Sequence, residues 1–203
     1  SVGVFLAFGA VQGAAARGLG ASAGGRVPAT PVAIVVALLG LGLVGCGERG
    51  LSLLNDLLGI PKVEVKAVCD VLPAQTAKAQ ALCEKRKAKR PEAYTRGELH
   101  YEELVRRDDL DLVYLPTPWR WHVRMAVAAM EAGKHAIVEV PAAVTLEECW
   151  RLVEVSERTR RHCVMIENCN YGYEEMLVNR MVKAGLFGEL LHAECAYNHD
   201  LRQ

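Results

Sequence analysis

A glycine-rich segment carries the residue types best suited to holding a ligand. Residues 45–50 read Gly-Cys-Gly-Glu-Arg-Gly and follow an apolar run. Glycines at this spacing allow a tight turn, close approach of the backbone to a pyrophosphate, and close packing of a helix on a strand. A helix beginning there would direct its N–H groups at the phosphates. The segment therefore predicts a dinucleotide-binding turn, with four cofactor-binding residues: Gly45, Gly47, Glu48 and Arg49.

An acid follows the next apolar run, at the position where a ribose would lie. Residues 63–69 read Val-Glu-Val-Lys-Ala-Val-Cys, and Asp70 comes directly after them. The acid follows the turn at close to the spacing of about 20 residues expected for such sites. A carboxylate at that strand end pairs with ribose hydroxyls and repels a 2′-phosphate. Asp70 therefore predicts NAD rather than NADP as the cofactor.

Two other interpretations of this region stay open. Residues 40–45, Gly-Leu-Gly-Leu-Val-Gly, also fit the glycine spacing, although the leucine-rich helical pattern follows the later glycines directly. Residues 43–46, Leu-Val-Gly-Cys, resemble a bacterial lipoprotein cleavage box. Such signals follow a basic segment at the start of a chain, whereas this cysteine is residue 46. We take the nucleotide turn as the working interpretation.

The composition is that of an ordinary globular chain. Of its 203 residues 51% are hydrophobic, and 24 basic residues balance 24 acidic ones. A net charge near zero gives no electrostatic argument for nucleic acid or an anionic membrane. The basic cluster at 85–90 fits the solvated end of a helix. The seven cysteines are scattered, without a Cys-x-x-Cys pair, so we expect no metal site and favour a cytoplasmic location.

Strand and helix patterns alternate from residue 39 onward, which predicts an α/β chain with a doubly wound parallel sheet. We expect this Rossmann domain over 32–186. Residues 187–203 would open a second, α+β domain, whose first strand would cover 189–197. Because the chain ends soon afterwards, we expect it to be truncated. The alanine- and glycine-rich residues 1–31 are interpreted as a leader, a processing remnant or an artificial extension.

The apolar patterns also place individual elements. Short strands are expected at 112–115, 136–138 and 163–166, and helices at 73–89 and 101–107. Residues 145–148, Thr-Leu-Glu-Glu, form a capping box at the start of another helix. The side chains that this helix is expected to bury are Leu146, Cys149, Trp150 and Val153.

Further motifs follow the later strands. Residues 117–122 read Thr-Pro-Trp-Arg-Trp-His, residues 132–135 Ala-Gly-Lys-His, and residues 139–141 Glu-Val-Pro. In this order, with the glycine turn and Asp70, they resemble the Gfo/Idh/MocA oxidoreductase family over residues 39–203. Sugar dehydrogenases of that family carry Glu-Lys-Pro at the third motif and use its lysine in proton transfer, which Val140 cannot do.

The valine points to one branch of the family. Together with Trp-Arg-Trp-His, Glu-Asn at 167–168 and Tyr-Asn-His-Asp at 197–200, it resembles glycoside hydrolase family 109. These are NAD-dependent glycosidases, best known as α-N-acetylgalactosaminidases. The resemblance implies that NAD⁺ takes hydride from C3 of the sugar, a base removes the C2 proton, and the C1 substituent is eliminated. Water then adds and the hydride returns, so the cofactor is recycled.

The expected function is therefore removal of a terminal N-acetylhexosamine from a glycan or small glycoside. An NAD-dependent sugar dehydrogenase and a non-catalytic nucleotide-binding fragment stay open as alternatives. The missing second domain would supply most of the sugar site, so we expect little turnover from these 203 residues alone. The resemblance also keeps export and a homo-oligomer open.

The resemblance extends the site beyond the glycine turn. The nicotinamide side of the cofactor would be lined by Trp119, Arg120, Trp121, His122, Glu139, Val140 and Asn168. Tyr197 would contact the sugar and His199 would act as the acid–base partner, with Tyr171 a weaker candidate. Simpler interpretations also stay open: the tryptophans would pack a loop, His122 would cap a helix, Asn168 would form a turn and Tyr197 would belong to a core.

Overall fold

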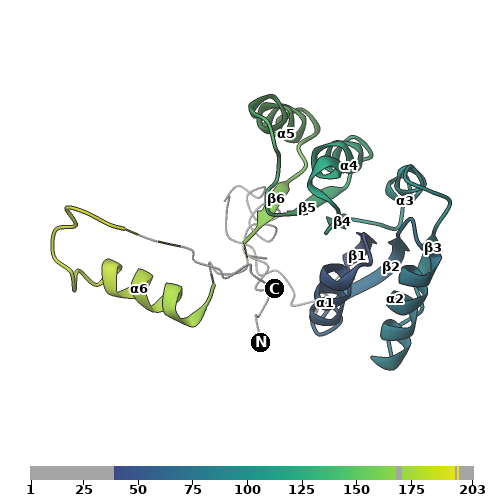
Figure 1. The fold of residues 1–203 in the computed structure, drawn as a ribbon, viewed down its shortest axis with the longest axis horizontal. Coiled ribbons are helices and arrows are strands. Elements are labelled where there is room, and N and C mark those ends of the chain that lie inside the picture. Colours follow the sequence, from purple (N-terminus) through teal and green to yellow (C-terminus); the bar gives the residue numbers. More distant parts are fainter. Residues whose placement is uncertain (1–38, 168–170, 195, 197–203) are drawn as a thin grey trace, which may run out of the picture. The chain divides into compact units, whose positions relative to one another are not determined.

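The computed structural model describes residues 39–167, 171–194 and 196 (Figure 1). Contacts divide the chain into two compact units after Glu167. The expected leader at 1–31 lies outside the described residues. No helix among the residues that are described is long and apolar enough to cross a membrane.

Strands and helices alternate along the first unit. Its strands are β1 (Leu39–Val44), β2 (Val63–Cys69), β3 (Glu92–Tyr94), β4 (Leu112–Leu115), β5 (His135–Glu139) and β6 (Cys163–Ile166). Its helices are α1 (Glu48–Leu57), α2 (Pro73–Lys85), α3 (Tyr101–Val105), α4 (Trp119–Glu131) and α5 (Leu146–Thr159). The strands expected at 112–115 and 163–166 are confirmed with those bounds. The three residues of β3 are too few to produce a recognisable apolar alternation.

The strands of this described unit form one six-stranded sheet in the order β3-β2-β1-β4-β5-β6, with every pair parallel. The predicted doubly wound parallel sheet is confirmed. The order reverses between β1 and β4, and ligands bind in such sheets in the crevice outside the carboxyl ends at that switch point. Parallel strands end at the same edge, so the glycine turn, Asp70 and Glu139 all reach it.

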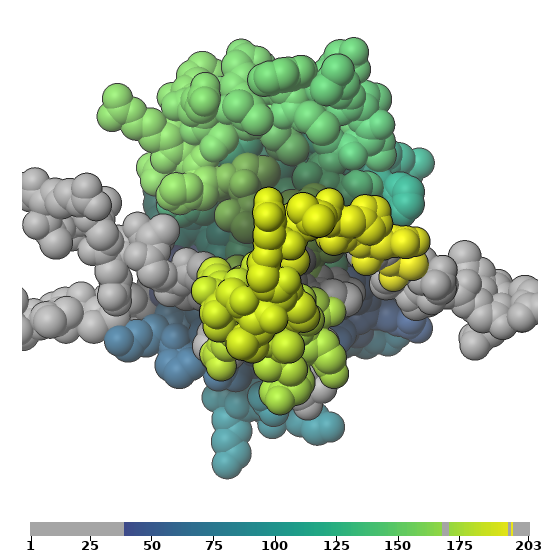
Figure 2. Space-filling view, turned by 90° about the vertical axis from the view of Figure 1, so that its left-hand side faces the viewer, coloured from purple at the N-terminus to yellow at the C-terminus, as the bar shows by residue number. Residues whose placement is uncertain are grey.

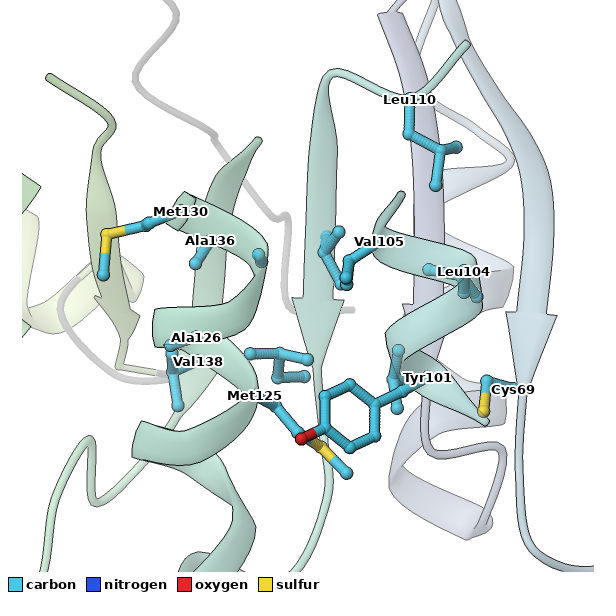
Figure 3. Close-up of a cluster of buried hydrophobic side chains, with 14 of the residues drawn as sticks. Cys69, Tyr101, Leu104, Val105, Leu110, Met125, Ala126, Met130, Ala136 and Val138 are labelled. Atoms are coloured by element: carbon cyan, nitrogen blue, oxygen red, sulfur yellow. The ribbon is translucent and has the colours of Figure 1, made fainter. Parts of the chain in front are cut away.

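Two clusters of buried side chains cover the two faces of the sheet. Because side chains alternate along a strand, Leu41 and Leu43 of β1 belong to one cluster and Val44 to the other. Helices α1 and α2 cover the first face, and α3, α4 and α5 cover the second. Figure 3 shows part of the second cluster, with side chains that include Cys69, Tyr101, Leu104, Met125, Met130 and Val138.

Helix α5 confirms the predicted capping box but not its predicted buried face. The Thr145 hydroxyl accepts from the Glu148 N–H (3.2 Å), and the Glu148 carboxylate accepts from the Thr145 N–H (3.3 Å). Leu152 and Val155 are the buried residues of the helix. The side chains expected there are exposed instead: Leu146, Cys149, Trp150 and Val153. The sequence pattern alone favoured the stripe with Trp150 and Val153. The helix packs against α4 through the other apolar stripe, which contains Leu152 and Val155.

The second unit contains α6 (Tyr173–Lys183) among its described residues. None of the residues of α6 is buried, and its side chains are seen at the surface in Figure 2. The prediction of a strand at 189–197 was wrong for the described residues 189–194 and 196, because they form no helix or strand. A strand is defined by hydrogen bonds to a neighbouring strand, and an apolar sequence cannot supply that neighbour.

Burial changes the acidity of the thiols in the first unit. It raises the pKa of Cys69 to about 12, with a further contribution from the charge of Asp70. Burial also raises the pKa of Cys83 and of Cys163 to about 11, from the ordinary value of 9.0. The described cysteines are all free thiols, so these groups stay protonated well into the alkaline range.

We expect the free energy of unfolding to fall as the pH rises above 9.0, the ordinary pKa of the thiols. The unfolded chain then loses thiol protons that the folded chain keeps, so alkali favours the unfolded state. Each buried thiol contributes a slope of up to about 1.4 kcal/mol per pH unit. Urea titrations from about pH 8 to 10.5 measure the profile. Cys69→Ala should make it shallower, and an unchanged slope in that variant would contradict this origin.

Candidate dinucleotide-binding site

The three glycines of the turn meet different constraints. Gly45 has φ +102°, and a Cβ there would lie 2.7 Å from the Pro116 carbonyl oxygen. At Gly50 a Cβ would lie 2.0 Å from the carbonyl oxygen of Gly45, so helix and turn touch backbone to backbone. A Cβ at Gly47 would meet no described atom within 4 Å. The protein itself therefore requires the first and third glycines, whereas the second leaves the backbone open to a ligand.

The open glycine is also the residue that starts α1. Gly47 is the N-cap of this helix and supplies no side-chain cap. The first-turn N–H groups of a helix have no acceptor within the helix, and the helix dipole favours an anion beside them. A phosphate at this position would accept from these groups. The turn thus has the geometry to accept the pyrophosphate that the sequence analysis expects there.

Asp70 holds the turn in place. Its Oδ2 accepts a hydrogen bond from the Cys46 N–H (2.8 Å), and its Oδ1 accepts one from the Leu72 N–H (2.9 Å). The side chain is partly exposed, and each carboxylate oxygen has capacity for another donor. Asp70 therefore fixes the glycine turn to the end of β2 and still offers acceptors to ribose hydroxyls.

A second polar cluster joins α1 to β4 and β5. The Arg49 Nε donates to the Glu139 Oε2 (2.9 Å), and the Tyr114 hydroxyl donates to the Glu139 Oε1 (2.6 Å). Burial of Tyr114, followed by this hydrogen bond to the carboxylate, raises the pKa of the phenol. Arg49 and Glu139 were predicted site residues and are brought together. The sequence analysis missed Tyr114. The available signal for it was an aromatic, hydroxyl-bearing residue in the otherwise aliphatic strand Leu-Val-Tyr-Leu.

His122 links the loops that follow β4 and β5. Its side chain is 0% exposed. Its Nδ1 lies 2.7 Å from the Pro141 carbonyl oxygen, and its Nε2 lies 2.7 Å from the Thr117 carbonyl oxygen. Both ring nitrogens are therefore engaged with the backbone. In this structure the imidazole ties two loops of the binding edge to each other.

The neighbours of His122 at the start of α4 differ in their exposure. Trp119 is 62% exposed, and the Arg120 side chain is also exposed. The Trp121 ring packs edge-on against Tyr101, with ring centroids 6.4 Å apart, and the Arg124 guanidinium lies over it. Trp119 and Arg120 are thus open to a ligand, whereas Trp121 packs on α3.

Thr117 carries a polar atom that the sequence did not single out. Its hydroxyl oxygen is buried and has no hydrogen-bond partner among the described residues. Its methyl carbon lies 3.1 Å from where a Cβ of Gly45 would be, so it borders the glycine turn. A buried hydroxyl without a partner is rare in proteins, and this one lies at the switch point.

The remaining predicted residues lie elsewhere or beyond the described part. Val140 is 41% exposed directly after β5. Tyr171 is exposed and belongs to the second unit. Asn168, Tyr197 and His199 lie outside the described residues. Within the described residues no group of histidine, cysteine and acidic side chains is arranged to hold a metal ion.

The glycines provide a matched pair of variants. Gly50→Ala should prevent folding or cost several kcal/mol, because its Cβ would collide with the Gly45 carbonyl oxygen. Gly47→Ala should change the free energy of unfolding by about 1 kcal/mol or less, because its backbone is extended and its Cβ is unobstructed. It should nevertheless weaken dinucleotide binding. Urea unfolding and calorimetric titration measure both, and normal cofactor affinity in folded Gly47→Ala would contradict this placement.

A parallel sheet with this strand order, an open glycine turn and an acid after β2 define a dinucleotide-binding Rossmann domain. Residues 39–167 match the oxidoreductase family with an NAD-binding Rossmann fold, Gfo/Idh/MocA. Residues 171–203 match the C-terminal domain of glycosyl hydrolase 109. The chain belongs to the Gfo/Idh/MocA oxidoreductase family and carries a glycosyl hydrolase 109 C-terminal segment. The predicted family is confirmed, and NAD is the cofactor of this family.

Curated relatives come from the same branch. The chain is 54% identical to a glycosyl hydrolase family 109 protein of Solibacter usitatus, over 164 residues that make up 80% of this chain and 37% of the relative. It is 50% identical to the alpha-N-acetylgalactosaminidase of Shewanella oneidensis, over 80% of this chain and 35% of that protein. The chain thus spans little more than a third of these relatives.

Solved structures share the fold. The scyllo-inositol dehydrogenase of Lactobacillus casei, with bound NAD(H) and scyllo-inositol, has a TM-score of 0.65 and 20% identity, covering 74% of this chain and 42% of that one. An NAD binding oxidoreductase of Klebsiella pneumoniae has a TM-score of 0.63 and 25% identity, covering 75% of this chain and 40% of that one.

Proposed function

We propose that this chain is the NAD-binding part of a glycosidase that removes a terminal N-acetylhexosamine, α-N-acetylgalactosamine in particular. The observation that carries the proposal is Val140, which lies 41% exposed directly after β5, at the binding edge. A sugar dehydrogenase of this family would place a lysine there for proton transfer. The names of the curated relatives support the same reading.

The cofactor would lie across the switch point between β1 and β4. Its pyrophosphate would meet the backbone of Gly47, Glu48 and Arg49 at the start of α1, and its adenosine ribose would meet Asp70. The nicotinamide half would then lie beyond β4, near Trp119 and Arg120 at the start of α4 and near Glu139, Val140 and Asn168. When bound, NAD supplies a reversible oxidation at C3 of the sugar.

Other residues would handle the sugar. Tyr197 would contact it, and His199 would move a proton at C2 or at the departing oxygen, because an imidazole titrates near neutral pH. The predicted roles of Trp121 and His122 become supporting ones, since Trp121 is partly buried against Tyr101 and His122 is fully buried between two backbone carbonyl groups. Trp119 is the more exposed of the two tryptophans in this motif, and its ring would meet the ligand.

One alternative keeps specific support. Residues 39–167 match an oxidoreductase family with an NAD-binding Rossmann fold, which supports an NAD-dependent sugar dehydrogenase as the second candidate function. The two reactions differ in their products. A dehydrogenase accumulates NADH in proportion to the sugar oxidised, whereas a glycosidase that recycles its cofactor releases the aglycone without net NADH.

The test supplies the remainder of a C-terminal domain. A fusion of residues 39–203 to the rest of the Shewanella oneidensis relative should release nitrophenol from a nitrophenyl α-N-acetylgalactosaminide. Release should require NAD⁺ and leave no net NADH. The 203-residue chain by itself should show little turnover. Net NADH formation from free sugar, with no aglycone released, would contradict the glycosidase and favour the dehydrogenase.

Asp70→Asn tests the predicted cofactor preference. Each Asp70 oxygen now accepts a hydrogen bond from a backbone N–H group. In Asp70→Asn the amide –NH₂ would face one of these two donors, so we expect the free energy of unfolding to fall by about 1–3 kcal/mol. The preference for NAD over NADP should narrow, because the charge that repels a 2′-phosphate is gone. Urea unfolding and titration with both cofactors measure the two effects.

Asp111→Asn is the matched control, because Asp111 accepts from the Gly40 N–H (2.8 Å) at the opposite edge of the sheet. It should keep its cofactor preference, and it should lose less stability than Asp70→Asn, because an amide oxygen can still accept from the Gly40 N–H. If Asp111→Asn also narrows the preference for NAD over NADP, the effect is not specific to Asp70, and the proposed contact between Asp70 and the ribose is contradicted.

A further inference from the structure

The register of β4 and β5 explains why a tyrosine reaches the binding edge. Tyr114 pairs with Ile137, and side chains two residues apart share a face of the sheet. Glu139 therefore follows Ile137 on the face that Tyr114 occupies, one step closer to the carboxyl edge. The ring is long enough to extend along β5, and its hydroxyl lies 2.6 Å from the Glu139 Oε1.

The resulting contact fixes a carboxylate on two sides. Tyr114 is 1% exposed, so its hydroxyl has lost water and depends on Glu139 as acceptor. Glu139 is 13% exposed at its side chain, and its other oxygen accepts from Arg49 in the first turn of α1. A neutral donor from β4 and a cationic donor from α1 thus set the orientation of one carboxylate at the end of β5.

We propose that Tyr114 is a positioning residue for the nicotinamide riboside half of the cofactor, acting through Glu139. Asp70 lies after β2, on one side of the switch point, and Glu139 lies at the end of β5, on the other. A dinucleotide that places its adenosine ribose at Asp70 reaches toward Glu139 with its second half. This role rests on the proposed function, since it requires a dinucleotide in the crevice.

Tyr114→Phe removes the hydroxyl and keeps the ring. The probes are NAD⁺ and ADP, because ADP shares the adenosine and pyrophosphate of NAD⁺ but lacks the nicotinamide riboside. Calorimetric titration of the variant should show NAD⁺ affinity reduced about tenfold and ADP affinity changed by less than about twofold, the size expected for one buried hydrogen bond. A merely structural role would lower both affinities by the same factor or neither, and either result would overturn the proposal.

A double-mutant cycle shows whether the hydroxyl acts through the carboxylate. Glu139→Gln should lower NAD⁺ affinity selectively, and adding Tyr114→Phe to it should cause no further loss. Additive losses would overturn the proposed route. If Tyr114→Phe is too unstable for titration, Glu139→Gln by itself still tests the route, because an equal loss of NAD⁺ and ADP affinity in that variant would overturn it.

Tyr101→Phe is the control for the loss of a hydroxyl group from a buried tyrosine. Tyr101 is also 1% exposed but lies in α3, in the cluster on the other face of the sheet (Figure 3). It should lose stability without a selective loss of NAD⁺ affinity, and a selective loss there would overturn the assignment to Tyr114. A folded wild-type chain that binds ADP but not NAD⁺ contradicts this proposal, whereas one that binds neither contradicts the proposed function itself.

Discussion

The hydrogen bond from the Cys46 N–H to the Asp70 carboxylate decides where the glycine turn lies. It joins the end of β2 to the turn after β1, while Gly50 rests on the Gly45 carbonyl oxygen too closely for any Cβ. These two contacts aim the start of α1 at the switch point of the sheet. In the proposed function, the carboxylate that orders the protein's own backbone also meets the adenosine ribose. Stability and cofactor choice would then depend on one side chain, Asp70.

Polar side chains that connect separate segments order the other side of the switch point. His122 connects the backbone of the loops after β4 and β5, and Glu139 connects Tyr114 to Arg49. Each bridge joins segments that are distant in the sequence but reach the same edge of the sheet. Loops that bind ligands are commonly mobile, so such bridges give the edge a defined shape before a ligand arrives. The first half of the crevice is thus held by the Asp70 carboxylate and a close backbone contact, and the second by polar side chains that connect separate strands and loops.

The sequence predicts well those features that depend on local patterns. Apolar runs locate β2, β4 and β6, glycine spacing locates the turn, and the capping box locates the start of α5. Features set by packing between distant segments were missed. Helix α5 buries Leu152 rather than Trp150, since the position of α4 decides which stripe is covered. Sequence order likewise grouped Trp119 with His122, although Trp119 is 62% exposed at the start of α4 and His122, three residues later, is 0% exposed. Tyr114 could not be identified from the sequence, because its hydrogen-bond partner, Glu139, lies on another strand.

Titration of the folded chain with NAD⁺ and NADP⁺ tests the central claim most directly, namely that the Gly45 turn and Asp70 form an NAD site. Isothermal calorimetry on a sample whose fold is verified by circular dichroism suits the purpose. The account predicts one NAD⁺ bound per chain and clearly weaker binding of NADP⁺. A folded chain that binds neither dinucleotide, or binds both equally well, would contradict it.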